Sequence, residues 1–163
     1  MKHRLEKSNL NIYIDGASKG NPGEGACAAI FLNDKGEIIS EEGRALGICT
    51  NNFAEYSSLH LALSVAARFK AKKLTIYSDS ELLVKQFNGD YCIKDEKLKE
   101  LMEIIKKEAS KFDEISLKYI PREQNKIADE FVNKLLRSKK LSRSDRKKLQ
   151  KEREKRFKQD KLF

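Results

Sequence analysis

Four acidic side chains that lie far apart in the chain could together bind metal ions. They are Asp15, Glu55, Asp79 and Asp129. Carboxylates pressed together repel one another, and their pKa values rise unless cations neutralise them. Oxygen-only ligands suit Mg²⁺ or Mn²⁺ rather than zinc, and two such ions about 3.5–4 Å apart are a known arrangement for in-line phosphodiester cleavage. The four residues therefore predict a site that holds two divalent ions.

Each acid also has a plainer interpretation when it is taken alone. Asp15 could close a strand with an Asx turn. Glu55 and Asp129 lie near predicted helix starts, where an acid interacts favourably with the helix dipole. No nucleophilic catalytic set competes with the acids, because the two histidines are His3, in the charged N-terminus, and His60, in the middle of a predicted helix.

A predicted α/β fold must position these acids. We expect strands at 10–15, 25–32, 37–46, 73–78 and 115–120, and helices at 53–69, 80–87, 96–109 and 125–137. Three antiparallel strands followed by βα crossovers imply a mixed sheet with helices on its faces. If the first and fourth strands are parallel neighbours, Asp15 and Asp79 emerge at the same edge, where ligands of open α/β sheets bind.

Turn and cap residues set the predicted boundaries. Asp15 is predicted to end its strand, because a loop rich in glycine and proline follows it. The segment 33–36, Asn-Asp-Lys-Gly, predicts a hairpin. Thr50, Asn51 and Asn52 offer caps for the long helix, and Asp95 caps a later one.

Length and charge indicate one globular domain with a basic tail. The 163 residues suffice for one hydrophobic core, and we divide them into an N-terminal extension (1–9), a folded domain (10–137) and a basic tail (138–163). The segment 139–163 holds twelve Lys/Arg against four Asp/Glu, whereas the rest of the chain holds 22 basic and 21 acidic residues. A basic appendage on a nearly neutral domain indicates a polyanionic partner.

The sequence also favours a location inside the cell. The apolar runs are strand-sized, so we expect no membrane span, and the first nine residues lack the apolar stretch of a secretory signal. Cys27, Cys49 and Cys92 form no CxxC pair, which suits a reducing compartment. We expect a cytoplasmic monomer whose cysteines are buried core residues.

Four motifs, in order, resemble those of type I ribonuclease H. They are 15–18 with 20–23, 50–55, 77–80 and 125–129, and the resemblance covers about residues 9–137. It implies a five-stranded sheet in the order 3-2-1-4-5, with Asp15, Glu55, Asp79 and Asp129 as catalytic and metal-binding residues. It also implies an endonuclease that uses two Mg²⁺ ions, or Mn²⁺, to hydrolyse the RNA strand of RNA–DNA hybrids and leaves 5′-phosphate ends.

The resemblance further implies a set of substrate-binding residues, which are Gly16, Asn21, Thr50, Asn51, Asn52 and Lys94. The three asparagines match positions that touch the minor groove of the hybrid, where the 2′-hydroxyl distinguishes RNA from DNA. Thr50 matches a residue that contacts a DNA phosphate. Helix capping by Asn51 or Asn52, turn formation by Asn21 and a merely solvated Lys94 stay open as alternatives.

The chain departs from the family pattern in several features that contact the substrate or assist the reaction. Ile48 and Asp95 stand where a basic residue and an Asn are common, which weakens the expected phosphate pocket. Only residues 88–92 separate the second helix from Ile93, at the entry to the third helix, so the basic protrusion of the best-known members is missing. The best-known members carry a loop histidine after the last strand, which assists proton transfer or product release. The corresponding loop 121–125 has no histidine, and we expect Arg122 or Glu123 to take over part of that role.

Two alternatives to hybrid cleavage stay open. The same chemistry could extend to double-stranded RNA, because recognition by the shape of the minor groove tolerates it. Alternatively, the chain could be a catalytically weak nucleic-acid-binding protein. Cleavage of a labelled hybrid with and without Mg²⁺ separates the enzyme from a catalytically weak binding protein, and competing double-stranded RNA tests the broader substrate choice.

Deletion of the basic tail should weaken substrate binding without changing the chemistry. Lys and Arg bound to phosphates release counterions, so affinity falls steeply with salt. Removing residues 138–163 should raise KM and flatten its salt dependence, with kcat little changed, as steady-state assays at several salt concentrations would show. Unaltered binding at every salt concentration would contradict a role for the tail.

Overall fold

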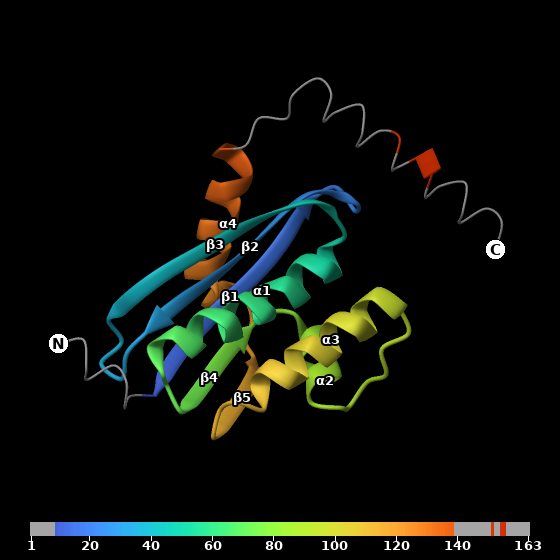
Figure 1. Cartoon of the computed structure of the whole chain (residues 1–163). Coiled ribbons are helices and arrows are strands. Elements are labelled where there is room, and N and C mark those ends of the chain that lie inside the picture. The colour runs from blue at the N-terminus through green and yellow to red at the C-terminus, as the bar shows by residue number, and fades with distance from the viewer. Residues whose placement is uncertain (1–8, 139–150, 152–153, 156–163) are drawn as a thin grey trace.

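The computed structural model describes residues 9–138, 151 and 154–155 (Figure 1). The predicted N-terminal extension, except Asn9, and most of the predicted basic tail lie outside these residues. The described strands are β1 (Leu10–Lys19), β2 (Gly23–Leu32), β3 (Ile38–Cys49), β4 (Lys73–Ser78) and β5 (Glu114–Tyr119). The helices are α1 (Asn51–Ala66), α2 (Glu81–Phe87), α3 (Glu96–Ala109) and α4 (Lys126–Ser138), with short 3₁₀ turns η2 (Ala67–Phe69) and η3 (Arg122–Gln124).

The five strands form one mixed sheet in the order β3-β2-β1-β4-β5, as the sequence predicts. β1 pairs antiparallel with β2, and β2 with β3. β1 pairs in parallel with β4, and β4 with β5. The parallel register places Ile14 opposite Ser78, so the residues that follow them, Asp15 and Asp79, leave the β1–β4 ladder at the same edge.

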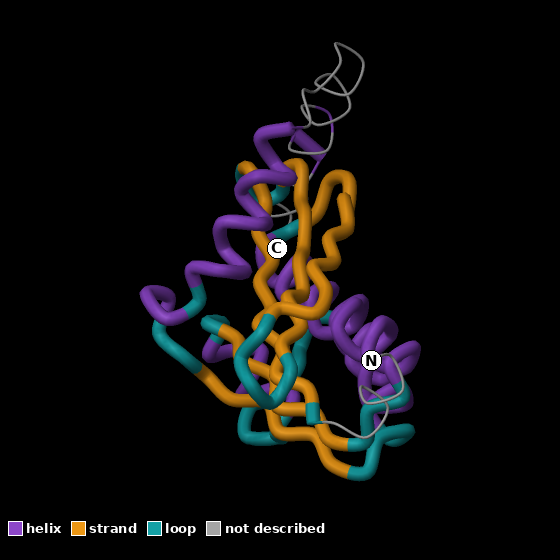
Figure 2. The backbone as a smooth tube through the Cα atoms, turned by 90° about the vertical axis from the view of Figure 1, so that its left-hand side faces the viewer, coloured by secondary structure: helices purple, strands orange, loops and turns teal. Residues whose placement is uncertain are grey.

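Helices cover both faces of the sheet (Figures 1 and 2). α1, α2 and α3 lie on one face over the main core, which contains Leu10, Ile12 and Ile14 of β1 together with Leu59 and Leu63 of α1. α4 lies on the other face over a smaller cluster of Ala26, Ala28, Val132 and Leu136. The two layers leave β1 and β2 buried on both sides.

Residue size explains how the centre of the sheet is packed. Nine of the ten β2 residues are buried, and the strand reads GEGACAAIFL, whose small side chains let helices approach from both faces. α1 is buried over most of its surface, because it lies between the sheet and α3. α3 instead buries one stripe, centred on Met102 and Ile105.

The prediction that β1 ends at Asp15 is wrong. β1 runs to Lys19, because its ladder with β2 continues to the pair Lys19–Glu24 after β4 has ended. The turn lies at residues 20–22 instead. Asp15 is therefore a residue inside a strand, at the point where β1 loses one of its two neighbours.

The prediction for the start of the long helix is also off by two residues. Thr50 is the N-cap, since its Oγ1 accepts a hydrogen bond from Phe53 N at 3.2 Å. Capping by Asn51 or Asn52 is therefore wrong, because both lie within α1. Glu55 consequently falls in the second turn rather than the first, whereas Asp129 does lie in the first turn of α4.

Two smaller expectations have mixed outcomes. Cys27 and Cys49 are buried, but Cys92 is exposed, because it lies in the loop between α2 and α3. Asp95 caps α3, with its Oδ1 accepting from Leu98 N at 3.0 Å, as predicted. Among the described residues, no helix is both long enough and apolar enough to cross a membrane.

A methyl group at Gly16 should be far more destabilising than one at Gly43. A Cβ at Gly16 would lie 2.1 Å from the backbone oxygen of Ala54, so α1 would have to move away from β1. A Cβ at Gly43 would meet only the ends of the Leu135 and Phe131 side chains, which can rotate. We expect Gly16→Ala to cost roughly 1–3 kcal/mol or more in urea unfolding, and Gly43→Ala clearly less. Equal costs would contradict this account of the α1–β1 contact.

Candidate functional site

Three of the four predicted acids lie together at the edge where β1 and β4 part. One carboxylate oxygen each from Asp15, Glu55 and Asp79 lies within 4.8 Å of the others. β1 supplies Asp15, the residue after β4 is Asp79, and α1 supplies Glu55 across the sheet edge. Asp15 is only 5% exposed, whereas Glu55 and Asp79 are half-buried.

Glu55 is held against β1 by the backbone of Gly16. The N–H of Gly16 donates a hydrogen bond to Glu55 Oε1. This contact exists because Gly16 has no side chain where α1 crosses β1. The structure therefore gives Gly16, predicted as a substrate-binding residue, a direct role in placing Glu55.

Asp129 lies beside the group of three rather than within it. It is half-buried in the first turn of α4, and its Oδ2 accepts a hydrogen bond from Asn133 Nδ2 at 3.3 Å, one turn further along. It is nevertheless close enough to Asp15 to contribute to that residue's electrostatic environment. Three of the four predicted acids thus converge fully, and the fourth borders them.

Burial and nearby negative charge make Asp15 and Glu55 reluctant to ionise. Desolvation, then the charge of Asp79, raises the pKa of Asp15 from 3.8 to about 7. Desolvation, then the charges of Asp15 and Asp79, raises the pKa of Glu55 well above its usual value, against the opposing hydrogen bond from Gly16. A bound cation would relieve both effects.

The donor chemistry of the group fits a hard divalent ion. Every donor is a carboxylate oxygen, with no histidine or cysteine among them, which suits Mg²⁺ or Mn²⁺ and not zinc. Clustered carboxylates without a cation are destabilising, so their burial together favours a metal-binding purpose. Asp15, Glu55 and Asp79 would hold such an ion, with Asp129 at the border of the site.

Two of the three predicted substrate-binding asparagines, Asn21 and Asn51, form a hydrogen-bonded network where the β1–β2 hairpin meets α1. Asn51 Oδ1 accepts from the N–H of Ser18 at 3.0 Å and from its hydroxyl at 2.9 Å. The N–H of Asn51 donates to Asn21 Oδ1 at 3.1 Å. With these acceptor oxygens occupied, each amide keeps its NH₂ group to offer to a ligand. Asn21 can therefore stabilise the turn and still offer its NH₂ group to a ligand.

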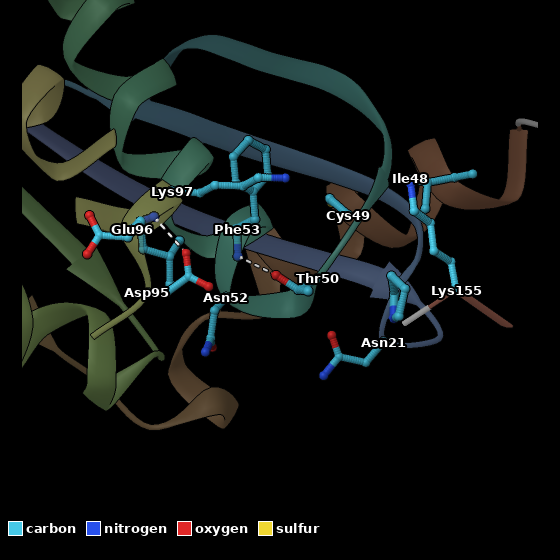
Figure 3. A pocket seen from close by; sticks show the side chains of 12 residues that line it. Asn21, Ile48, Cys49, Thr50, Asn52, Phe53, Asp95, Glu96, Lys97 and Lys155 are labelled. Atoms are coloured by element: carbon cyan, nitrogen blue, oxygen red, sulfur yellow. Dashed lines mark hydrogen bonds between the residues drawn. The ribbon is translucent and has the colours of Figure 1, made fainter. Parts of the chain in front are cut away.

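A cavity of about 740 Å³ opens beside this network (Figure 3). Asn21, Thr50 and Asn52 line it together with Ile48 and Asp95, the two departures noted in the sequence. Lys97 and Lys155 are the basic residues on its wall. None of the three clustered acids lines it, but Asn52 precedes Glu55 by three residues on α1, so the cavity begins about one helical turn, ~5 Å, from the acids.

The remaining predicted residues are more peripheral. Lys94 is exposed and is not among the residues that line the cavity, where Asp95, Glu96 and Lys97 stand instead. Arg122 and Glu123 are exposed in η3, a turn that the sequence reading missed. η3 leads into Asn125, which donates a hydrogen bond to Asp79, and Asp129 follows further along the chain.

The sequence reading also missed the roles of Ser18 and Asn125. Ser18 orients Asn51, as described above. Asn125 is fully buried, and its Nδ2 donates to Asp79 Oδ2 at 2.9 Å. Its position in the 125–129 motif was a signal, but it was interpreted only as the start of a helix.

Comparison with known proteins identifies the fold and its lineage. Residues 13–135 match the family described as "Reverse transcriptase-like". The chain is 35% identical over 127 residues to ribonuclease HI of Halobacterium salinarum, covering 78% of this chain and 64% of that protein. It is also 35% identical over 123 residues to a bifunctional protein of Mycobacterium tuberculosis, covering 75% of this chain and 34% of that protein. The chain thus spans less than two thirds of either relative.

Solved structures agree over nearly their whole length. The crystal structure of RNase H1 from H. salinarum superposes with a TM-score of 0.78 at 34% identity, covering 80% of this chain and 99% of that one. LC11-RNase H1, solved in complex with an RNA/DNA hybrid, gives a TM-score of 0.73 at 35% identity, covering 77% and 94%. By its sequence match, its identity to these proteins and its shared fold, the chain belongs to the type I ribonuclease H family.

Proposed function

We propose that this protein is a divalent-metal-dependent endonuclease that hydrolyses the RNA strand of RNA–DNA hybrids. The observation that carries the proposal is the convergence of Asp15, Glu55 and Asp79 within 4.8 Å at one sheet edge. The relatives named ribonuclease H, and the hybrid bound by LC11-RNase H1, support the choice of substrate. Asp129, which borders the group, completes the proposed set of catalytic residues.

The proposed cofactor is Mg²⁺, two ions per site, with Mn²⁺ as an alternative. When bound, such ions activate the attacking water and stabilise the leaving oxygen of the phosphodiester. The protein's part is to hold the carboxylates in place, chiefly through the Gly16–Glu55 hydrogen bond and the burial of Asp15. Water attacks phosphorus, the bond to the 3′-oxygen breaks, and the products carry 5′-phosphate and 3′-hydroxyl ends.

We infer that the asparagine network and the adjacent cavity bind the hybrid. The amide groups of Asn21, Asn51 and Asn52 can donate to acceptors in a broad minor groove, and Thr50 lies on the cavity wall. Lys94, Arg122 and Glu123 remain candidates, the first for phosphate binding and the others for assistance in proton transfer. Double-stranded RNA remains an alternative substrate. We also propose a cytoplasmic monomer, on the composition of the chain.

The central test is cleavage by a variant that lacks one charge of the acid group. Asp79→Asn keeps the size of the side chain and should lower kcat on a labelled hybrid by roughly 10²-fold or more, about 3 kcal/mol. Asp34→Asn, an exposed acid in the β2–β3 turn, is the matched control and should be unchanged. Cleavage that survives EDTA, or a fully active Asp79→Asn, would contradict the proposal. A competing RNA duplex in the same assay tests the broader substrate range.

The metal-free protein should lose stability as the pH rises from about 4 to about 7. Because the pKa of Asp15 rises from 3.8 to about 7 on folding, the folded protein binds more protons than the unfolded chain in this window. Stability is therefore fully present below the lower value and is lost as the pH passes through the upper one. Asp15→Asn should flatten this slope in thermal unfolding.

Magnesium should reverse the loss. At pH 8, saturating Mg²⁺ should raise the Tm of the wild-type protein by a few degrees or more, because ligands that bind only the folded state stabilise it. Asp15→Asn should show little or no rise. An unchanged wild-type Tm at pH 8 in Mg²⁺ would argue against a metal at this site.

A further inference from the structure

A buried amide lies directly behind the acid group. Asn125 immediately precedes α4 and is 0% exposed. It occupies the junction of three elements, namely β1, the end of β4 and the start of α4. Such a position is unusual for an Asn, which is mostly exposed in proteins.

Asn125 connects the strand of one acid to the side chain of another. Its Nδ2 donates to the backbone oxygen of Ile14 at 2.8 Å, next to Asp15, and to Asp79 Oδ2 at 2.9 Å. Both partners are acceptors, so the amide can face them in only one orientation. The reverse orientation would set its oxygen against a carbonyl and a carboxylate.

The other end of the same amide is left without a partner. Asn125 Oδ1 has no hydrogen bond, and it is the single such buried side-chain atom found in the part of the chain that the structure describes. Buried polar atoms are nearly always paired, so an exception calls for an explanation. The explanation here is that the two acceptors on the Nδ2 side determine how the amide points.

We propose that Asn125 is a positioning residue for the metal ligands. It fixes the rotation of the Asp79 carboxylate and ties it to the backbone of β1 beside Asp15, so that the two acids keep one spacing despite their repulsion. It acts through Asp79 and does not itself touch the reacting atoms. This inference rests on the proposed metal-dependent function, which the experiments below test separately.

The direct test measures metal binding rather than turnover. Asn125→Ala should weaken Mn²⁺ binding, measured by isothermal titration calorimetry, by about tenfold or more, as loss of a partner that orients a metal ligand does. On a labelled hybrid, kcat should fall while KM changes little. Val132→Ala, which empties buried space in the apolar cluster beneath α4, the helix that follows Asn125, is the matched control. It should bind Mn²⁺ within about twofold of wild type.

A double variant separates positioning from a general loss of stability. If Asn125 acts through Asp79, adding Asn125→Ala to Asp79→Asn should weaken Mn²⁺ binding by no more than about threefold beyond Asp79→Asn alone, since the two residues are coupled. Losses that multiply in full would contradict the positioning role. Should Asn125→Ala fail to fold, Asn125→Ser replaces it in both measurements, because the Ser side chain is polar but shorter than that of Asn.

A measurement on the wild-type protein tests the positioning role of Asn125 independently. The side-chain NH₂ signals of Asn125 should shift on saturation with Mg²⁺ in ¹⁵N–¹H spectra, and by more than those of Asn88, whose Nδ2 bonds the Leu117 carbonyl elsewhere in the fold. Equal shifts for the two, or Mn²⁺ binding by Asn125→Ala within about twofold of wild type, would overturn the positioning role alone. A wild-type protein that binds no divalent metal would overturn the proposed function and this inference together.

Discussion

The close crossing of α1 over β1 at Gly16 places the half-buried carboxylate of Glu55 against two other carboxylates. Glu55 reaches the sheet edge because the missing side chain of Gly16 lets the two backbones approach, and the Gly16 N–H holds it there. Burial of Asp15, followed by the charge of Asp79, opposes this arrangement and raises the pKa of Asp15 to about 7. The apolar core between the sheet and α1 supplies the opposing force, because α1 cannot leave without exposing that core.

A site built in this way is stable only in balance with its surroundings. The carboxylates are destabilising while they are ionised and unpaired, and a divalent cation converts the same charges into ligands. Local strain of this kind is typical of functional sites, where the rest of the fold compensates for it. The buried amide of Asn125 is a second example, because its oxygen stays unpaired while its NH₂ group donates to Asp79.

The proposed sites of substrate recognition and of chemistry occupy neighbouring but distinct places on the fold. The acids lie at the β1–β4 edge, whereas the cavity with Asn21, Thr50 and Asn52 begins about one helical turn away. The cavity wall combines Asp95 with Lys97 and Lys155, so its charge is mixed rather than strongly basic. Within the described part of the chain, no basic protrusion lies between α2 and α3, so Lys97 and Lys155 are the basic side chains at this cavity wall for the proposed binding of a hybrid.

The sequence by itself determined the mixed α/β class and the candidate acids, and its resemblance to the family implied the sheet order. It could do so because apolar periodicity and four ordered motifs are local signals that survive without knowledge of contacts. Its errors were local in the same sense. The end of β1 depends on how far β2 remains paired with it, and the start of α1 depends on which hydroxyl accepts the Phe53 N–H. Tertiary structure alone decided that three acids converge while Asp129 borders them. It also decided that the Gly16 N–H donates to Glu55 and that the Asn125 amide donates to Asp79. These facts arise from distances between residues remote in the chain, which packing sets and spacing does not encode.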